Sequence, residues 1–430
     1  MNTEEYRRIP SELFHWITFL TKALPIRSIP TFLELLIGAM FTTTGFVTEA
    51  ILFINPQKNW TTYYKWIEAG KWSWLSLVRQ FVRLVIMLRT DQVFHLAIDD
   101  TLTLRASKKA PASQIHHQHG NKPNLANYVR GQCWVSIAAV FKRNVLETVA
   151  IPLLFRLMPN SGNTGKLTAA NVLIQTLSTL FKGRRVRILV DSWFMRFTLI
   201  EHVLQLKFHV IGQARIDTRL YDSPPPKQPG QRGRPKKYGD KYSANRIAHL
   251  KRHRVTLNIY GKQQVVRYRQ RIVMARFLQG YKVHAVWCEH LTDKGVWTKA
   301  RLILSTDISL EATEIIESYA LRWSIESMFN QTKELWGLKQ AWQQHRQTLS
   351  RWVHLVAIGY GLQQLLILVL GERAQEYCLN VGWREKDPIT AGRLRTGLTR
   401  QFMHVNVLSF WNSKCKKFEH PNILEKSGFG

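Results

Sequence analysis

The chain has 430 residues, 45% of them hydrophobic, so it is long enough for two or three domains with sizeable buried cores. Lysine and arginine number 61 against 29 acidic residues, which gives a formal net charge of +32. This excess favours a polyanionic partner. The charge is spread along the chain instead of lying on one amphipathic helix or beside a span, which argues against a membrane-surface protein.

Other features of the composition point to the cytoplasm. The four cysteines are far apart and form no paired motif, which suits a reducing compartment and argues against a zinc knuckle or a disulfide framework. The apolar stretches 32–54 and 355–370 are interrupted by polar or acidic residues, so both are expected to be buried helices and not spans. The first eight residues show no leader-like apolar run. No membrane association is expected.

Residues 1–88 are predicted to be helical. Apolar or amphipathic segments at 31–41, 44–54 and 60–69 are separated by Thr/Gly and Asn/Pro breaks. This pattern fits a bundle of the helix-turn-helix kind. Lysines beside aromatic residues make it a candidate DNA-binding domain, although an ordinary helical bundle would show the same spacing.

A mixed α/β region is predicted from 89 to 216. The apolar run 93–98 reads as a strand that leads into Asp99 and Asp100. Strands at 132–141 and 145–155 form a hairpin, a helix follows at 168–181, and a β-branched strand at 186–190 delivers Asp191. A helix at 194–206 and a strand at 208–214 complete a mixed sheet.

The composition and pattern of the sequence change again after residue 216. Residues 217–308 are predicted to be a β-rich insertion, with a basic Pro/Gly loop at 224–241 and strands at 254–260, 264–275, 282–289 and 300–305. Helices at 311–336 and 345–370 then form a second part of the core, 309–372. The basic C-terminal region, 373–430, has no clear pattern.

One face of the helix predicted over 318–336 is polar. Tyr319, Arg322, Glu326 and Lys333 lie at offsets 0, 3, 7 and 14, which places them on one side at about 100° per residue. Glu326 could hold a divalent metal there, and the cations could hold phosphate oxygens. A solvated face with an ordinary Arg322–Glu326 ion pair is the alternative.

The order of the acids indicates a fold. A carboxylate at the end of a first strand, a second after a later strand and a third on a late helix is the order found in an RNase H-like fold, where acids surround two Mg²⁺ ions for phosphoryl transfer. Alternation along the first strand puts Asp99 and Asp100 on opposite faces, so only one of them can reach a shared metal. The residues alone do not decide which.

The chain resembles the DDE transposases of bacterial insertion sequences, in the branch with a Y-x-x-R-x-x-x-E-x-x-x-x-x-x-K signature. Tyr319, Arg322, Glu326 and Lys333 match every fixed position of it. The motifs Ile98-Asp99-Asp100-Thr101 and Leu189-Val190-Asp191-Ser192-Trp193 fit as well. The resemblance implies that Asp100, Asp191 and Glu326 are the catalytic metal ligands and that Tyr319, Arg322 and Lys333 contact DNA.

The resemblance also implies cofactors and partners. It implies two Mg²⁺ ions, for which Mn²⁺ may substitute, double-stranded DNA in the form of terminal inverted repeats and target, a homodimer on DNA and a place on the bacterial nucleoid. Relatives that form hairpin ends stack a flipped base on a tryptophan of the insertion. Here the aligned position is Arg301, and Trp297 is the candidate for stacking.

The basic loop of the insertion is a further candidate for DNA contact. Arg232, Arg234, Lys236 and Lys237 resemble a minor-groove hook, and a flexible loop that touches phosphates without sequence preference is equally compatible. Two other functions stay open: a metal-dependent nuclease of the same fold that cuts without joining, and a DNA-binding remnant of a transposase that has lost catalysis.

Overall fold

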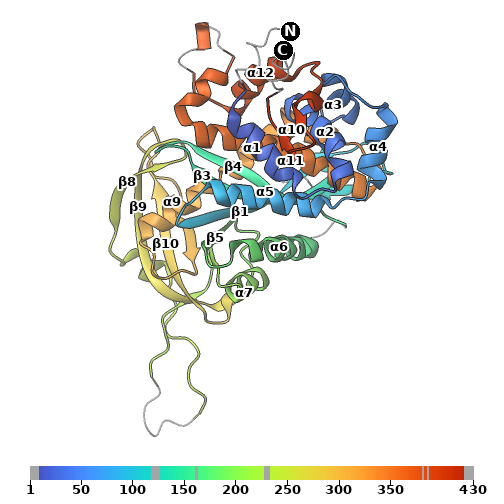
Figure 1. Cartoon of the computed structure of the whole chain (residues 1–430). Coiled ribbons are helices and arrows are strands. Elements are labelled where there is room, and N and C mark those ends of the chain that lie inside the picture. Colours follow the sequence, from blue (N-terminus) through green and yellow to red (C-terminus); the bar gives the residue numbers. More distant parts are fainter. Residues whose placement is uncertain are drawn as a thin grey trace, which may run out of the picture.

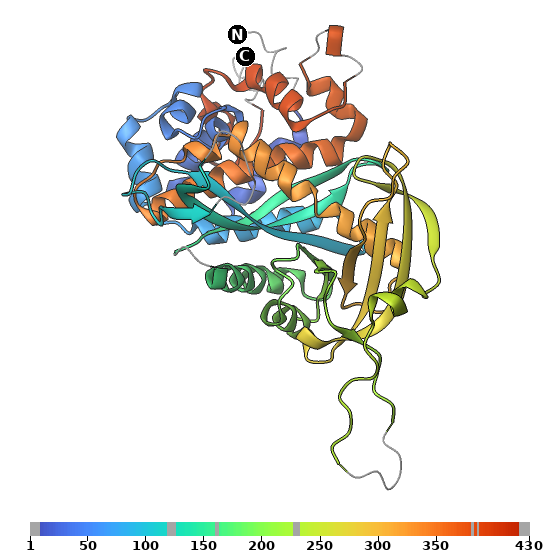
Figure 2. The ribbon, with the colours of Figure 1, turned by 180° about the vertical axis from the view of Figure 1, so that it is seen from behind.

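The computed structural model describes residues 9–117, 126–159, 163–226, 233–379, 382–384 and 387–420. A long sheet runs through the molecule. The N-terminal and C-terminal helices lie together on one side of it, and the strands of the insertion form its other end (Figure 1). The basic loop projects away from the insertion (Figures 1 and 2).

In the described residues the main sheet has 11 strands, and most neighbours follow the order β2-β3-β1-β5-β6-β11-β10-β9-β7, with β4 beside β3 and β8 beside β9. Their bounds are β1 Val93–Leu104, β2 Gln114–His117, β3 Tyr128–Lys142, β4 Thr148–Leu157, β5 Arg185–Val190, β6 His209–Ala214, β7 Leu220–Tyr221, β8 His253–Ile259, β9 Lys262–Ala275, β10 Lys282–His290 and β11 Arg301–Ser305. The β1–β5 and β5–β6 pairs are parallel and the other pairs antiparallel. This mixed sheet is consistent with an RNase H-like core and confirms the predicted fold class.

The helices fall into three groups along the chain. They are α1 Ser11–Thr21, α2 Ile29–Phe41, α3 Val47–Phe53, α4 Trp60–Ala69 and α5 Trp74–Leu88, then α6 Asn163–Ser178, α7 Phe197–Gln205 and the short α8 Ala244–Ala248, and finally α9 Ala312–Leu321, α10 Ser324–Glu334, α11 Arg346–Leu370 and α12 Ala391–Phe402. Two short strands, β12 Trp411–Asn412 and β13 Lys417–Phe418, pair near the end of the described chain.

The N-terminal helices pack around α11 and do not form a separate bundle. The guanidinium of Arg351 on α11 donates to the carbonyl oxygens of residues 67, 68, 70 and 72, at 2.7 to 3.1 Å. Trp352 Nε1 donates to Gly45 O at 2.7 Å. By length and composition, 346–377 could cross a membrane, yet 89% of its most apolar window is buried inside the fold. This agrees with the buried helix expected from the sequence.

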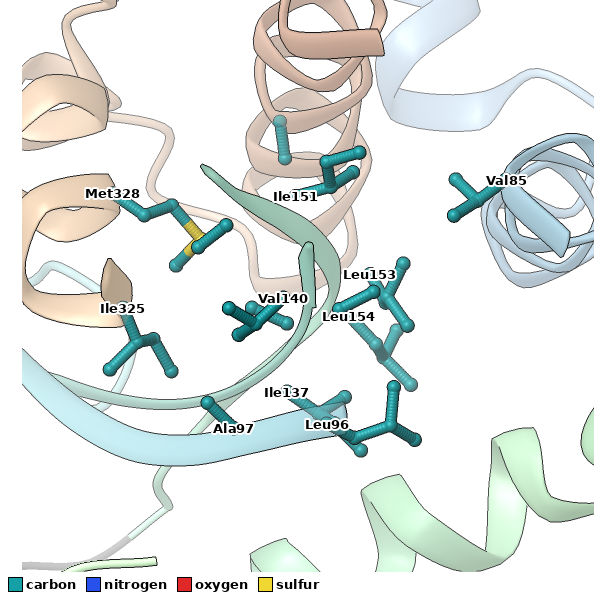
Figure 3. Packing of buried hydrophobic residues seen from close by; sticks show 14 of the residues in the cluster. Val85, Leu96, Ala97, Ile137, Val140, Ile151, Leu153, Leu154, Ile325 and Met328 are labelled. Atoms are coloured by element: carbon teal, nitrogen blue, oxygen red, sulfur yellow. The ribbon is translucent and has the colours of Figure 1, made fainter. Parts of the chain in front are cut away.

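The core beneath α10 fixes how that helix is turned. Ile325 and Met328 of α10 are buried and point toward β1, β3 and β4, where Ala97, Val140 and Ile151 contribute to the same cluster (Figure 3). Burying these apolar side chains stabilises one rotation of the helix. Glu326, between them in sequence, is therefore directed away from this cluster.

Three details differ from the sequence prediction. The helix expected over 318–336 is two helices, α9 and α10, joined by i→i−3 hydrogen bonds from Arg322 N–H to Tyr319 O and from Glu326 N–H to Trp323 O. The first strand does not stop before the acids, because pairing with β3 carries it to Leu104. The strands of the insertion also join the core sheet, through the β6–β11 pair. The domain boundaries inferred from the sequence stay predictions.

Candidate active site

Two aspartates lie side by side where the parallel part of the sheet ends. The last parallel pair between β1 and β5 is Ile98 with Val190, and the next residues are Asp99 and Asp191. Paired residues of neighbouring strands point to the same face, so continuation of this register places both carboxylates on one side. Asp191 Oδ1 accepts the backbone N–H groups of Trp193 and Phe194, at 3.0 and 3.1 Å, which fixes its orientation.

Arg322 connects this strand edge to the third acid. One of its terminal nitrogens, Nη1, donates to Asp99 Oδ2 at 2.9 Å, and the other, Nη2, donates to Glu326 Oε1 at 2.8 Å. Its side chain is only 10% exposed and that of Asp99 17% exposed, so solvent screens the pair less than it would at the surface. The structure thus gathers Asp99, Asp191, Arg322 and Glu326 in one polar site.

The electrostatics of Asp99 reflect crowding. Burial and, next, the charge of Asp191 raise the pKa of Asp99 to about 7, while Arg322 acts in the opposite direction. Two carboxylates sharing a poorly solvated site favour a cation between or beside them. In this structure Arg322 supplies that positive charge.

Asp100 lies on the other face of β1. Its Oδ2 accepts from Lys166 Nζ of α6 at 2.8 Å and is 3.5 Å from the thiol sulfur of Cys133. Although burial opposes it, the charge of Asp100 raises the pKa of Lys166, and burial raises the pKa of Cys133 to about 12. The structure therefore brings Asp99 together with Asp191 and Glu326, and does not bring Asp100 to them.

The donor atoms of these acids suit a divalent cation, but the side chains are not yet close enough together to hold one. Carboxylate oxygens are the donors that Mg²⁺ and Mn²⁺ prefer. Among the described residues, no group of three or more His, Cys, Asp or Glu side chains is gathered closely enough to hold a metal as it stands. Arg322 occupies one oxygen of Asp99 and one of Glu326 in this structure.

A comparison with known families identifies the class of protein. The family described as DDE superfamily endonuclease matches residues 30–273. This is more than half of the chain. The chain belongs to the DDE superfamily endonucleases. No individual curated protein matches it.

Membership of this family implies DNA as the substrate and a transposase or nuclease kind of activity, and the superfamily generally uses divalent metal ions. The match includes Asp99, Asp100 and Asp191 and ends before Glu326. The family match therefore does not reach Glu326, the candidate third acid, which Arg322 contacts.

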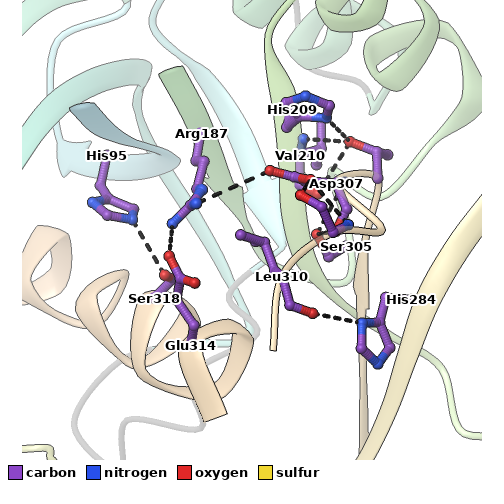
Figure 4. Close-up of polar contacts among 12 residues, drawn as sticks. His95, Arg187, His209, Val210, His284, Ser305, Asp307, Leu310, Glu314 and Ser318 are labelled. Atoms are coloured by element: carbon purple, nitrogen blue, oxygen red, sulfur yellow. Dashed lines mark hydrogen bonds and ion pairs between the residues drawn. The ribbon is translucent and has the colours of Figure 1, made fainter. Parts of the chain in front are cut away.

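Helix α9 holds Arg322 in place through a stripe of polar contacts. Glu314, Ser318 and Arg322 are four residues apart, so they share one side of the helix. Arg187 of β5 donates to Glu314 at 2.6 Å, and the His95 ring of β1 is 3.2 Å from the Ser318 hydroxyl (Figure 4). These contacts run from Arg187 of β5 to His95 and Asp99 of β1, all on one face of the sheet.

The remaining signature residues differ in how closely they join the site. The Tyr319 hydroxyl donates to Gln213 Oε1 of β6 at 3.2 Å. Burial raises the pKa of Tyr319 to about 12, so this phenol stays a neutral donor. Lys333 lies seven residues beyond Glu326, in the last turn of α10, about 10 Å along the helix axis. It is half-buried.

The candidate DNA contacts in the insertion lie apart from the acids. The guanidinium of Arg267 lies 4.3 Å from the ring centre of Trp297. Arg234, Lys236 and Lys237 are exposed on the projecting loop. Arg232 lies outside the described residues.

Sequence reasoning missed three neighbours of the site. Gln213 orients Tyr319, and Tyr260 and Trp323 line a cavity of about 370 Å³ beside the α9–α10 junction. Trp323 is 54% exposed and Tyr260, at the tip of the β8–β9 hairpin, has a positive φ of 55°. Only the position of Trp323, next to Arg322 in the signature, could have singled it out.

Proposed function

We propose that this protein is a DNA transposase that cuts the ends of an insertion sequence and joins them to a target by metal-assisted phosphoryl transfer. The observation that carries the proposal is the side-by-side placement of Asp99 and Asp191, joined through Arg322 to Glu326. Carboxylates gathered from two strands and one helix could hold the metal ions that this chemistry uses.

We assign Asp99, Asp191 and Glu326 as the residues that would hold the metal, in place of the Asp100 implied by the resemblance. A pair of divalent ions, Mg²⁺ or Mn²⁺, would activate the attacking oxygen and stabilise the leaving oxygen. Asp191 is held in place by two backbone N–H groups, so it offers a fixed carboxylate. Asp100 is already engaged by Lys166 on the opposite face.

Arg322 and Tyr319 then position the DNA strand. Arg322 has five N–H donors in a fork that matches phosphate oxygens, and its two carboxylate partners are the groups that a metal would neutralise instead. The neutral phenol of Tyr319 can donate a hydrogen bond to a phosphate oxygen from the same stripe of α9. Lys333, further along α10, adds a positive charge for the phosphates of the same strand. Two such sites, one in each copy of a dimer, would process the two ends of the element.

The test is cleavage of labelled DNA that carries the ends flanking the gene of this protein, with Mg²⁺ or Mn²⁺. Asp99→Asn, Asp191→Asn and Glu326→Gln should each lower the cleavage rate by at least about a thousandfold, while DNA binding in EDTA is kept. Asp100→Asn is the matched control, because it removes the adjacent carboxylate on the opposite face. It should retain measurable cleavage.

The outcomes separate the competing assignments. Loss of cleavage in Asp100→Asn, with full activity in Asp99→Asn, would return the first acid to Asp100. Cleaved DNA ends that never join to a target would reduce the proposal to a nuclease of the same family. Binding without cleavage by the unaltered protein, across several end lengths, would favour the non-catalytic remnant.

A further inference from the structure

The two faces of the insertion have different chemistry. On β9 the even-numbered residues face α9, since Gln270 contacts His284, which in turn contacts Leu310 O at the base of α9. Alternation turns Arg267, Arg269 and Arg271 to the opposite face. Arg254 of β8 pairs directly with Arg267 and joins them. These four residues, Arg254, Arg267, Arg269 and Arg271, are here called the arginine face.

The arginine face carries more positive charge than the described acids around it neutralise. Arg267 forms an ion pair with Glu289 of β10. Neither Arg254 nor Arg269 has an ion-pair partner within the described part of the chain, and Arg269 Nε is a buried donor for which those residues provide no hydrogen-bond acceptor. Burial, with the nearby charge of Arg252, lowers the pKa of Arg269.

This arrangement is unfavourable for the sheet by itself. Arg254 and Arg267 are directly opposite each other on neighbouring antiparallel strands, where like charges destabilise the pair. A buried donor without a partner adds a cost of its own. A polyanion bound on this face would neutralise the charges and satisfy the donor.

Aromatic rings lie among the arginines. The Trp297 ring centre is 5.9 Å from the guanidinium carbon of Arg254 and 4.3 Å from that of Arg267. Tyr242 accepts a hydrogen bond from Arg271 Nε at 3.2 Å, and its ring centre lies 6.4 Å from that of Trp287. Stacked arginine planes are held in fixed orientations, which reduces the entropy lost when they bind phosphate.

The basic loop belongs to the same surface. Tyr242 lies five residues after Lys237, so the described residues 233–241 of the loop lead to the arginine face, and they project from the insertion (Figure 2). From Arg267 to Arg271 the strand advances about 14 Å. A DNA duplex carries one charge for about every 1.7 Å of its axis, so several phosphates fit this length.

We infer that the arginine face binds a second DNA duplex, separate from the one at the acids, and that Arg234, Lys236 and Lys237 add to this contact. The acids, Tyr319 and α9 lie on the other side of the sheet, so one short duplex cannot contact both surfaces. This inference rests on the proposed function, in which the protein engages a target duplex as well as an element end. Trp297, the candidate for base stacking, contacts Arg254 and Arg267 of this face.

The test uses the full-length protein in EDTA, saturated with unlabelled end DNA, and titrates a labelled 30-bp duplex of unrelated sequence. Arg254→Gln/Arg269→Gln should weaken binding of this second duplex at least tenfold at low salt. It should also lower the slope of log affinity against log salt by about 2, since two phosphate contacts are lost. Cleavage of end DNA, measured separately with Mg²⁺, should persist, while joining to a target falls.

Two further variants serve as controls. Lys262→Gln/Lys282→Gln removes two lysines from β9 and its neighbour β10, at positions that alternation places on the α9 side, and should leave binding of the second duplex unchanged. Arg254→Lys/Arg269→Lys keeps the charge and should retain most of the affinity. Because Arg254→Gln relieves a like-charge pair, the double glutamine variant should unfold at a urea concentration no lower than the unaltered protein.

Three results would overturn the inference. One is an unchanged affinity and salt slope in Arg254→Gln/Arg269→Gln. Another is binding of a single duplex per chain by the unaltered protein. The third is displacement of the labelled duplex by an RNA hairpin at lower concentration than by DNA, which would assign the face to RNA. Absence of cleavage by the unaltered protein would instead count against the proposed function, and the binding measurements would still be decisive for the arginine face.

Discussion

At the scale of single residues, Arg322 determines the charge balance of the site. It donates to both Asp99 and Glu326. Without it, Asp99 would face Asp191 in a poorly solvated place and would lose the guanidinium with which it is paired. A buried carboxylate that loses its partner costs several kcal/mol, far more than the net contribution of the intact pair.

Arg322→Ala should therefore lower the free energy of unfolding in EDTA by about 2–4 kcal/mol, as measured by urea denaturation. Asp99→Asn/Arg322→Ala should recover part of this loss, since the buried charge is removed together with its partner. Such non-additivity in a double-mutant cycle would measure the coupling. Equal and additive losses would mean that Arg322 acts through packing, and that Asp99 is better solvated than its raised pKa indicates.

The choice between the two adjacent aspartates also belongs to this scale. The sequence could show that Asp99 and Asp100 point to opposite faces of the strand, but not which of them shares a face with Asp191, because alternation fixes relative and not absolute orientation. The register between β1 and β5 settles the orientation, and it depends on contacts among residues about 90 positions apart in the chain. No local pattern encodes that register.

At the scale of elements, α9 carries Tyr319 and Arg322 to the sheet, and the polar stripe fixes its position. Arg187 is 8% exposed, and it contacts Glu314 at 2.6 Å and Asp307 at 4.0 Å. Burial in the low-dielectric interior lowers the pKa of His95 to about 4, so this ring is neutral and can share one hydrogen bond with Ser318. The stripe therefore holds α9 at the register that aligns Arg322 with Asp99.

Arg187→Ala should destabilise the protein by about 2–3 kcal/mol, since it leaves Glu314 and Asp307 without their cation. It should also lower kcat for end cleavage more than it weakens DNA binding, because α9 would no longer place Arg322 accurately. Glu317→Gln is the control on the same helix: its pair with Lys142 is long, at 3.6 Å, and largely exposed. If both variants lose stability but keep the kcat of the unaltered protein, the stripe does not position the site.

Several elements could be predicted from hydrophobic periodicity and others could not. The strand at 186–190, the 60–69 helix and the buried helix at 345–370 were recovered almost to the residue, since each is a long or uniform pattern. The break between α9 and α10 was not, because residues 321–324 contain neither Pro nor Gly and both Arg322 and Trp323 keep helical dihedral angles. A change in hydrogen bonding from i−4 to i−3 leaves no mark in the composition.

At the scale of the whole molecule, α11 joins the N-terminal helices to the core. Gly45, in the loop before α3, lies so close to Gly337 that an added Cβ would approach the carbonyl oxygen of Gly337 to 1.9 Å. Gln363 Nε2 donates to Met40 O at 2.7 Å in the same interior. The sequence indicated a helical N-terminus, but not that its partner helix lies some 300 residues later. We therefore expect the N-terminal helices and α11 to unfold as one cooperative unit.

Substitution of Arg351 tests this cooperative unfolding most directly. It is 3% exposed, and it donates to four carbonyl oxygens, two in the last turn of α4 and two in the segment that follows. Arg351→Ala should cost about 3 kcal/mol or more, since several buried acceptors lose their donor at once. Arg373→Ala, at an exposed residue paired with Glu12, should cost less than about 0.5 kcal/mol. Urea transitions followed by tryptophan fluorescence and by circular dichroism should coincide in both variants. A separate early transition in Arg351→Ala would show instead that the N-terminal helices can detach while the catalytic core stays folded.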